Sequence, residues 1–517
     1  MRKTLKVVAF GGGPADAFIK AAGITDSTQQ TAIKTLVNDL NGYGLWSKMK
    51  AIYPMVGGNA TAHSYNLKDT TKFQITWNGG LTHSSNGVTG NGTNGYGNTN
   101  LSPNTNLVKY NTHTSIYLRT NTDGIYCDLG ASNDSFNEMV TIYSKDSGNA
   151  KSDMGNYAIS RISAATSNSL GNYINSRTAN NVFKLYKNST TLGTNTSTDT
   201  NNLPLKNLTI FGINYGASPS QFSNRQCAFA TIGEGLSDTE AANLYTSIQK
   251  FQTTLNRFVG TPIVSDSDAQ TFLNTASITD LTQANAVNTL VTDLKGANLW
   301  TKMKAVYPMV GGTATSHSYN LKNPSQFQIT WNGGITHSST GALPNGTNGF
   351  GDTNLNALSN LTYNSTHLAY YSRTANGTGS GKTELGTQNG ASSIINLGVY
   401  TYSAQIHACA YNNSSSALLV NNSTNNSSGF YVANRASSTS LKSYRNAVSF
   451  GTNSNTSAGT IPNNNIYLAA NGNTSSKYEY SDRECAFASI GDGLTDSEVT
   501  TLYNIVQTYE TTLSRNI

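Results

Sequence analysis

Residues 45–51 read LWSKMKA, and residues 299–305 repeat them as LWTKMKA. The ends of the two copies match as well, because residues 224–257 and residues 482–515 are identical at 18 of 34 positions. Solenoid repeats are about 20 to 50 residues long, whereas each copy here spans about 250 residues, the length of a whole domain. The chain is therefore a tandem duplication of one domain.

The duplication sets the expected domain boundaries. We place the first domain at residues 16–258 and the second at residues 267–517, with a linker at residues 259–266. Residues 1–15 lie outside the repeated unit. Their apolar stretch at 7–10 is too short for the core of a signal peptide, so we expect synthesis without a standard secretion signal. We predict that residues 1–15 are an N-terminal anchor that adds a short strand to the sheet edge of a partner.

Each copy opens and closes with the pattern of an amphipathic helix. In the opening helix, apolar residues follow the spacing i, i+3, i+4 and i+7. Asp26 and Asp280 precede the opening helices with the side-chain oxygen of an N-cap. The closing helices begin with the capping boxes Ser237-x-x-Glu240 and Thr495-x-x-Glu498. The apolar positions of the opening helices are Ile33, Leu36, Val37 and Leu40 in the first copy and Val287, Leu290, Val291 and Leu294 in the second.

Between these helices the period of the apolar residues changes from about 3.6 to about 2. Residues 73–77 and 327–331 both read FQITW and alternate like half-buried strands, as do shorter runs such as 116–118 and 208–210. Glycine and asparagine bound these runs. Many short strands separated by turns predict a mainly β fold, in which each domain is a jelly-roll sandwich flanked by an N-terminal and a C-terminal helix.

Composition and charge exclude several classes of protein. Only 12% of the 517 residues are charged, and 33 Lys and Arg against 27 Asp and Glu give a net charge of +6. The low net charge and the 28 tyrosines argue against a disordered chain. Because the charges are scattered, the chain also lacks the basic stripe that binds nucleic acid. No apolar run approaches the roughly 18 residues of a membrane helix, so we expect no membrane partner.

The four cysteines are Cys127, Cys227, Cys409 and Cys485. None has the C-x-x-C spacing of a zinc or redox motif. Two fall in each copy, so disulfides within a domain remain open. The unrelated surroundings of Cys127 and Cys409 make a reduced compartment the simpler interpretation.

Residues 90–95, GNGTNG, match the G-x-G-x-x-G pattern of dinucleotide sites. That pattern binds a pyrophosphate only where a strand leads in and a helix N-terminus follows, and residues 96–106 have no helical period. The second copy replaces the first glycine by Pro344. We therefore predict a turn here and no cofactor.

A glycosidase needs two carboxylates about 5 to 9 Å apart, which a strand can present on one face at i and i+2. The nearest match is Glu479, Asp482 and Glu484, whose counterparts in the first copy are amides unable to exchange the proton: Gln221, Asn224 and Gln226. A solvated turn explains these charges equally well. Serine is abundant, so a Ser-His-Asp triad stays open, although no G-x-S-x-G elbow is present. We predict no catalytic residues.

Three histidines recur at matching positions of the two copies and are candidates for metal ligation: His63 with His317, His83 with His337, and His113 with His367. They lack the close spacing of ligands on helices or fingers, so hydrogen bonds to neighbouring loops are the simpler interpretation. Asp492, Asp496 and Glu498 resemble an acidic calcium loop, but the capping box and the helix dipole already account for two of them. We predict no metal site.

The copies diverge most between residues 131–207 and 387–465. We interpret the matched segments as the shared core and these Ser- and Asn-rich segments as edge strands and loops, where substitution costs least. If the chain binds a ligand selectively, we expect the site among these loops. The pattern does not identify individual ligand-binding residues.

Residues 228–240, followed by Leu244 and Tyr245, look like the last strand and helix of concanavalin A-like jelly rolls of the laminin G or pentraxin type, and residues 486–503 carry the same pattern. Residues 45–68 and NGTNGY at 91–96 resemble modules in virion structural proteins of tailed bacteriophages, notably those that infect Bacteroidota. This resemblance covers nearly all of both copies. It implies two lectin-like domains that contact glycans or host surfaces. Some members bind calcium, but their acidic ligands have no clear counterpart here.

The resemblance leads us to expect a non-enzymatic virion structural protein, either a head decoration or an appendage of the tail or fibre. Its expected partners are other virion proteins and host-surface glycan, in several copies per particle or as a homo-oligomer. Its expected location is the virion, assembled in the cytoplasm of the bacterial host. Two alternatives stay open: a concanavalin A-like depolymerase that cleaves glycans with the Glu479 to Glu484 region, and an architectural decoration without a ligand.

Overall fold

The computed structural model describes residues 12–375, 381–389, 393–400, 405–410, 418–421, 426–454 and 460–517. It divides into two compact units, Met1–Ile263 and Val264–Ile517. Residues 1–11, most of the predicted anchor 1–15, lie outside the described residues. Helix α1 (Pro14–Ala21) begins before that segment ends and buries Ala15, so residues 14 and 15 belong to the first unit.

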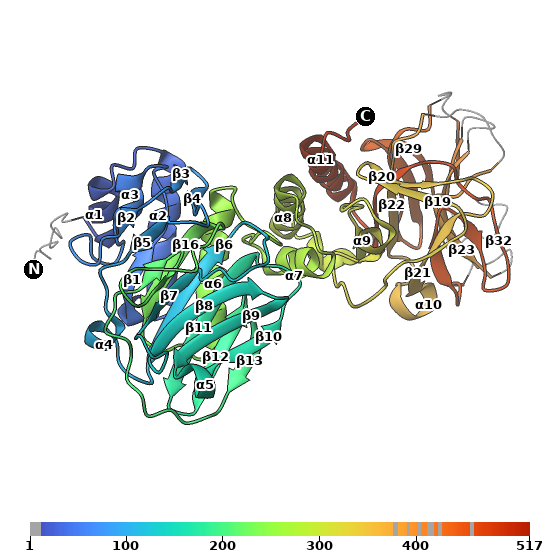
Figure 1. Ribbon diagram of the computed structural model, residues 1–517. Coiled ribbons are helices and arrows are strands. Elements are labelled where there is room, and N and C mark those ends of the chain that lie inside the picture. Colours follow the sequence, from blue (N-terminus) through green and yellow to red (C-terminus); the bar gives the residue numbers. More distant parts are fainter. Residues whose placement is uncertain are drawn as a thin grey trace, which may run out of the picture. The chain divides into compact units, whose positions relative to one another are not determined.

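The first unit contains two sheets packed face to face (Figure 1). We call the sheet that carries the helices the helix-side sheet. Its strand order is β13 (Thr190–Asn195), β12 (Val182–Lys187), β11 (Gly171–Ala179), β6 (Thr112–Leu118), β16 (Gln226–Gly233), β4 (Gly87–Thr89) and β3 (Thr82–Ser84), with β1 (Met49–Tyr53) also paired to β16.

The second sheet of this unit, the outer sheet, carries no helix layer. Its order is β10 (Ile162–Ala165), β9 (Asn149–Gly155), β8 (Met139–Asp146), β7 (Leu129–Ser132), β14 (Thr209–Ile210), β5 (Tyr96–Asn98) and β2 (Thr76–Asn78). These strands pair antiparallel, and the short β15 (Ile213–Asn214) runs parallel to β7.

Strand β6 contributes side chains to two apolar layers, because successive side chains point to opposite faces of the sheet. Ile116 and Leu118 lie in the core between the sheets, whereas Tyr117 packs against the helices. Each such buried apolar side chain contributes about 1.5–3 kcal/mol to folding. The sequence period of two therefore places one apolar set between the sheets and a second set under the helix layer.

Helices α1, α2 (Ser27–Gly42) and α6 (Asp238–Thr254) cover the helix-side sheet. The predicted caps are confirmed. Asp26 accepts a hydrogen bond from the Gln29 backbone N–H at 2.8 Å, and Ser237 and Glu240 form the reciprocal capping box. Helix boundaries were thus encoded locally, by side chains that satisfy the free N–H groups of the first turn.

The second unit repeats this architecture. Its helix-side sheet runs β19 (Ile335–Ser338), β20 (Gly341–Pro344), β33 (Cys485–Gly491), β22 (Thr366–Ser372), β27 (Gly429–Ser437), β28 (Ser440–Arg445) and β29 (Val448–Asn453), with β17 (Met303–Tyr307) paired to β33. Its outer sheet runs β18 (Thr330–Asn332), β21 (Phe350–Asn356), β30 (Asn465–Leu468), β23 (Leu385–Gln388), β24 (Ile394–Tyr400), β25 (Gln405–Ala410) and β26 (Leu418–Asn421).

Helices α7 (Ser267–Thr275), α8 (Leu281–Gly296) and α11 (Asp496–Thr512) form the helix layer of the second unit. The Asp280 cap and the Thr495–Glu498 capping box are both present. The predicted fold class, two tandem jelly-roll sandwiches flanked by helices, is confirmed.

The strand predicted at residues 73–77 is wrong over its first three residues. Phe73 has a φ of 55°, a left-handed backbone that cannot continue a strand. Its carbonyl oxygen accepts a hydrogen bond from the hydroxyl of buried Tyr53 at 2.7 Å. Residues 73–75 therefore form an irregular segment that is held by a tertiary contact, and β2 covers only Thr76–Asn78. Phe327 and Tyr307 repeat this arrangement in the second unit.

Candidate functional site

A pocket of about 330 Å³ opens on the outer face of the first unit's outer sheet. Strand β8 divides its side chains between two environments: Val140 and Ile142 lie in the core between the sheets, and Met139 and Tyr143 lie in a small separate cluster on the other face. The pocket is lined by Ile125, Phe136, Met139, Tyr143, Asp146, Tyr157, Arg161 and Gln221.

Apolar and aromatic surface is exposed around this pocket. Ile125 is 63% exposed, Tyr157 is 50% exposed and Phe136 is 38% exposed. Phe136 packs against Tyr215, with ring centroids 5.0 Å apart. Exposed aromatic faces of this kind are the surfaces on which ligand rings stack.

Arg161 forms the charged wall of the pocket. It follows the short helix α5 (Tyr157–Ser160), and its guanidinium lies 4.2 Å from the centre of the Tyr157 ring. Two parallel hydrogen bonds join it to Asp153, from Nε at 2.9 Å and from Nη2 at 2.6 Å. A bidentate pair fixes the guanidinium plane, so Arg161 and Tyr157 are held in one geometry.

Tyr143 and Gln221 join the floor of the pocket to a neighbouring loop. The Tyr143 hydroxyl donates to Oε1 of Gln221 at 2.6 Å. Burial raises the pKa of the Tyr143 hydroxyl well above its ordinary value, so it remains a donor. This bond orients the Gln221 amide, whose nitrogen has no hydrogen-bond partner among the described residues and is available to a ligand.

Asp146 reaches the pocket because the β8–β9 ladder shifts register between Tyr143 and Asp146. Such irregularities re-aim side chains at strand ends. The carboxylate accepts hydrogen bonds from Lys151 at 2.7 Å and from Ser147 at 2.9 Å. Burial alone would raise the pKa of Asp146, but these hydrogen bonds lower it overall, so Asp146 is an ionised acceptor at neutral pH.

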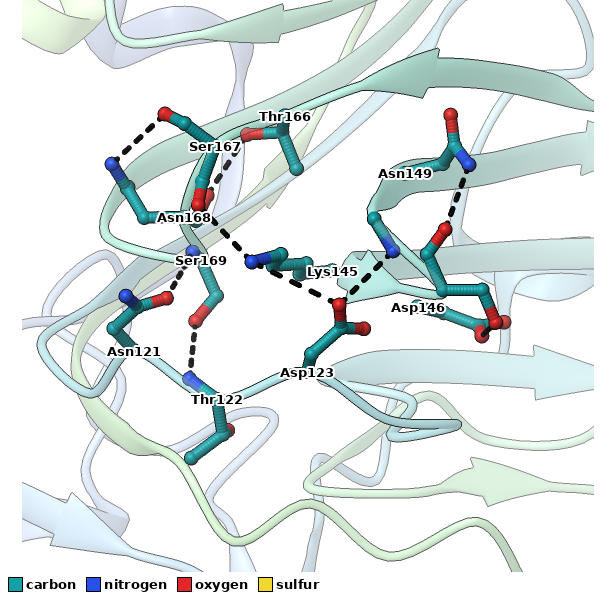
Figure 2. A network of polar contacts seen from close by, with 12 residues as sticks. Asn121, Thr122, Asp123, Lys145, Asp146, Asn149, Thr166, Ser167, Asn168 and Ser169 are labelled. Carbon is teal, nitrogen blue, oxygen red and sulfur yellow. Dashed lines mark hydrogen bonds and ion pairs between the residues drawn. The ribbon is translucent and has the colours of Figure 1, made fainter.

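Three loops beside the pocket are joined by polar contacts, which Figure 2 shows. Asp123 accepts the backbone N–H of Gly148 at 3.0 Å and lies 3.8 Å from the ammonium of Lys145. Lys145 in turn donates to the carbonyl of Ser167 at 3.0 Å. Because Asp123 holds the loop that directly follows Asp146, the pocket rim is fixed in place without a ligand.

Lysine also fills the oxygen-rich part of these loops. The ammonium of Lys187 donates to the Thr166 hydroxyl at 3.0 Å and to both oxygens of Asn168, at 2.7 and 2.9 Å. Burial lowers the pKa of Lys187 to about 8, so it is mostly charged at neutral pH. A positive charge thus already sits among the oxygens that a hard cation would use.

Six of the eight lining residues lie within 131–207, the segment that the two copies share least. Ile125 and Gln221 come from outside it. Divergence between the copies was therefore the sequence signal that pointed to this region. The individual residues were missed because strand register and the loop at Gln221 bring them together.

The second unit has a different residue at the centre of the corresponding surface. Leu129 pairs with Ile142 in the first unit and Leu385 pairs with Leu397 in the second, so Gly398 takes the register position of Tyr143. Glu479 stands where the first unit has Gln221, and both have positive φ. The aromatic floor of the pocket is therefore not repeated at position 398.

Two of the three predicted histidines of each copy come together. Nδ1 of His63 lies 2.9 Å from Nδ1 of His83, with ring centroids 5.2 Å apart, so the nitrogens lie nearly on the line between the rings. That is the geometry of an N–H···N hydrogen bond. Among the residues that the structure describes, Nε2 of His63 is buried without a partner. This favours His63 as the donor, because a buried N–H without an acceptor costs more than a bare lone pair. His317 and His337 repeat the pair at 3.0 Å.

His113, the third histidine, lies elsewhere. It is fully buried, and its ring nitrogens contact the Glu234 carbonyl and the Thr231 hydroxyl. His367 makes the matching contacts with Asp492 and Ser489. In the described residues, no group of three or more His, Cys, Asp or Glu side chains is arranged to hold a metal ion.

Each carboxylate of the alternative enzyme site has its own protein partner. Glu479 accepts from the Thr383 hydroxyl at 2.7 Å, Glu484 pairs with Arg373 at 2.8 Å, and Asp482 lies 3.7 Å from Lys382. Of the proposed calcium loop, Glu498 pairs with Lys302 at 2.6 Å, while Asp492 and Asp496 pair with Lys304 and Lys442. These contacts give every one of these acids a structural role.

The remaining sequence motifs are structural. The predicted turn at 90–95 is confirmed, because the Asn91 side chain accepts the backbone N–H groups of Thr93, Asn94 and Gly95 at 2.9–3.1 Å. Cys127, Cys227 and Cys485 are buried free thiols, and the Cys409 side chain lies outside the described part of the structure. Across the described residues, the helices lack the length and hydrophobicity needed to span a membrane.

The fold and the pocket together define a two-unit jelly-roll β-sandwich protein with a ligand-sized pocket on one outer sheet. No protein-family model matches the chain, and no curated protein matches it either. Solved structures do match parts of it. The NanB sialidase of Streptococcus pneumoniae is 15% identical, with 26% of this chain and 24% of that chain covered and a TM-score of 0.22. The match thus spans about a quarter of the sialidase.

Two smaller proteins are matched over most of their length. One is the Ruminococcus gnavus IT-sialidase CBM40 bound to α2,3-sialyllactose, which is 13% identical over 26% of this chain and 81% of that chain, with a TM-score of 0.23. The other is domain 4 of AbnA, an extracellular GH43 arabinanase from Geobacillus stearothermophilus, in complex with arabinotriose. It is 14% identical over 38% of this chain and 98% of that chain, with a TM-score of 0.28. At these TM-scores the likenesses carry no argument about ligand or activity.

Proposed function

We propose that this chain is a non-enzymatic carbohydrate-binding protein whose ligand occupies the pocket on the outer sheet of the first unit. The observation that carries the proposal is the pocket itself, in which exposed aromatic faces at Phe136 and Tyr157 adjoin fixed polar groups at Gln221, Asp146 and Arg161. Sugars present the complementary surface, since C–H faces stack on aromatic rings and hydroxyls bond to amides and carboxylates.

The experiment is a glycan array probed with the whole chain and with the variants Tyr157→Ala and Phe136→Ala. We expect the wild-type protein to bind a defined set of glycans and both variants to lose at least about tenfold in affinity, because each removes an aromatic face. Tyr43→Ala is the matched control, since Tyr43 is an equally exposed tyrosine at the end of α2, away from the pocket. An array that stays blank would support the architectural alternative.

We also propose that the protein is a structural component of a bacteriophage virion, where it is displayed in several copies and contacts other virion proteins. The sequence resemblance of residues 45–68 and 91–96 supports this part of the proposal. Particles purified from the bacterial host should contain the chain by mass spectrometry. Deleting residues 1–11 should abolish its incorporation and leave the folding of both units unchanged, because those residues precede α1. Normal incorporation of the truncated chain would contradict the anchor.

A further inference from the structure

Both charged side chains that line the pocket, Arg161 and Asp146, are paired with an opposite charge. Arg161 pairs with Asp153 at 2.6 Å and Lys151 pairs with Asp146 at 2.7 Å. Two neighbouring pairs are Arg225 with Asp128 at 3.0 Å and Lys145 with Asp123 at 3.8 Å. Each of these four pairs is neutral as a unit, whereas the Lys187 ammonium of the neighbouring loops is held by neutral oxygens.

This pairing penalises a charged ligand. Asp153 is fully buried, accepts from the Thr141 hydroxyl at 2.6 Å and occupies Nε and one N–H of Nη2 of Arg161. A ligand carboxylate can form the bidentate pair with Arg161 only by displacing Asp153, and at the remaining N–H donors it meets a guanidinium whose charge is already compensated. An unpaired Asp153 would be a buried charge without compensation, which costs several kcal/mol. A cationic ligand would likewise meet an Asp146 carboxylate whose charge Lys151 already compensates.

The groups that are left for a ligand are uncharged or already compensated. The amide nitrogen of Gln221 can donate, the compensated Asp146 carboxylate can accept, and Phe136 and Ile125 offer apolar surface. One face of Tyr157 is covered by Arg161, so a ligand ring meets its other face or Phe136. These groups suit hydroxyls and C–H faces better than carboxylates or ammonium groups.

We propose, building on the carbohydrate-binding function above, that this pocket selects uncharged sugar residues over acidic ones. Binding then depends on stacking and neutral hydrogen bonds, whose strength is nearly independent of salt, whereas an acidic glycan held by a free cation would be released as salt screens the pair.

The test uses pairs of oligosaccharides that differ only in one acidic residue, titrated into the whole chain by calorimetry. We expect the neutral member to bind at least about tenfold more tightly, with an affinity that changes less than about twofold between about 50 and about 500 mM sodium chloride. Tighter binding of the acidic member, with an affinity that falls as salt rises, would overturn the selectivity. Binding of neither member, after a blank array, would overturn the carbohydrate-binding function itself.

The variant Asp146→Asn provides a second test, because it leaves Lys151 without its acid at the pocket. Asp146 is chosen because it is less buried than Asp153. Its folding is checked by thermal unfolding. We expect the affinity for the acidic member to rise about two- to fivefold, the range of a partly exposed charge pair, and this gain to disappear at high salt. An unchanged acidic-to-neutral ratio in the folded variant would contradict a selectivity set by charge pairing.

Discussion

Oε1 of Gln252 accepts a hydrogen bond from Nε of Arg257 at 2.6 Å, in the position where the second unit pairs Arg515 with Glu510. Arg257 is 1% exposed, and its other donors bond to the backbone carbonyls of Pro54, Met55, Ser85 and Ala228. Burial lowers the pKa of Arg257 to about 9. The first unit therefore stabilises this buried charge with neutral oxygens alone, whereas the second unit adds a carboxylate to a similar set of backbone carbonyls.

This difference predicts opposite effects of two reciprocal substitutions. Glu510→Gln should lower the free energy of unfolding of the second unit by about 1–3 kcal/mol at pH 8, because Arg515 loses a charged partner. Gln252→Glu should raise the free energy of unfolding of the first unit, because it gives Arg257 a charged partner. Urea unfolding measures both, with Asn504→Asp on the exposed face of α11 as the control for added charge. Equal effects of the same sign would contradict the argument.

The two units also predict the stoichiometry of binding. Because Gly398 stands in the register position of Tyr143, we expect one ligand per chain and not one per unit. Isothermal titration of the whole chain should give a stoichiometry near one, and Tyr157→Ala should weaken that single site by at least about tenfold. A stoichiometry near two, or a component of unchanged affinity in Tyr157→Ala, would show that the second unit binds as well.

If the carboxylates of the alternative enzyme site have structural roles, replacing them should change the stability of the protein and no enzymatic activity. Glu484 pairs with Arg373 and accepts from Thr340, so Glu484→Gln should cost about 1 kcal/mol of stability. Glu479→Gln and the wild-type chain should both release no reducing ends from host polysaccharide. Release by the wild type that both Gln variants abolish would instead establish a depolymerase.

Local signals predicted the parts of this fold that depend on neighbouring residues. Asp26 and Gln29 are three positions apart, so the cap was predictable from the sequence. The irregular segment at Phe73 was not predictable, because it is fixed by Tyr53, twenty residues away, and periodicity alone extended the strand through it.

The pocket was predictable only as a region. Arg161 meets Asp153 through the β9–β10 connection and Tyr143 meets Gln221 across 78 residues, so strand register, which the pattern does not specify, decides both contacts.

The buried histidines predict acid sensitivity in a defined window. Burial lowers the pKa of His113 to about 4 and that of His63 to about 3, below the value of about 6.5 in the unfolded chain. Between about pH 6.5 and pH 4, the unfolded chain therefore binds protons that the folded chain does not. The contribution of these histidines to the free energy of unfolding is therefore fully present above about pH 6.5. It is lost as the pH falls through this window.

The range from about pH 6.5 to pH 5 separates this effect from that of the carboxylates with lowered pKa values, such as Asp238 and Asp496, which titrate at lower pH. In the second unit, Glu510 acts in the opposite direction, because burial raises its pKa to about 7 and its protonation favours the folded state as the pH falls. The first unit has Gln252 at the matching position, so no carboxylate there opposes its histidines. Urea unfolding of His113→Gln should show a shallower loss of stability across this range than the wild type, since Gln retains hydrogen bonding but takes up no proton. An identical slope in the two proteins would show that another group carries the acid sensitivity.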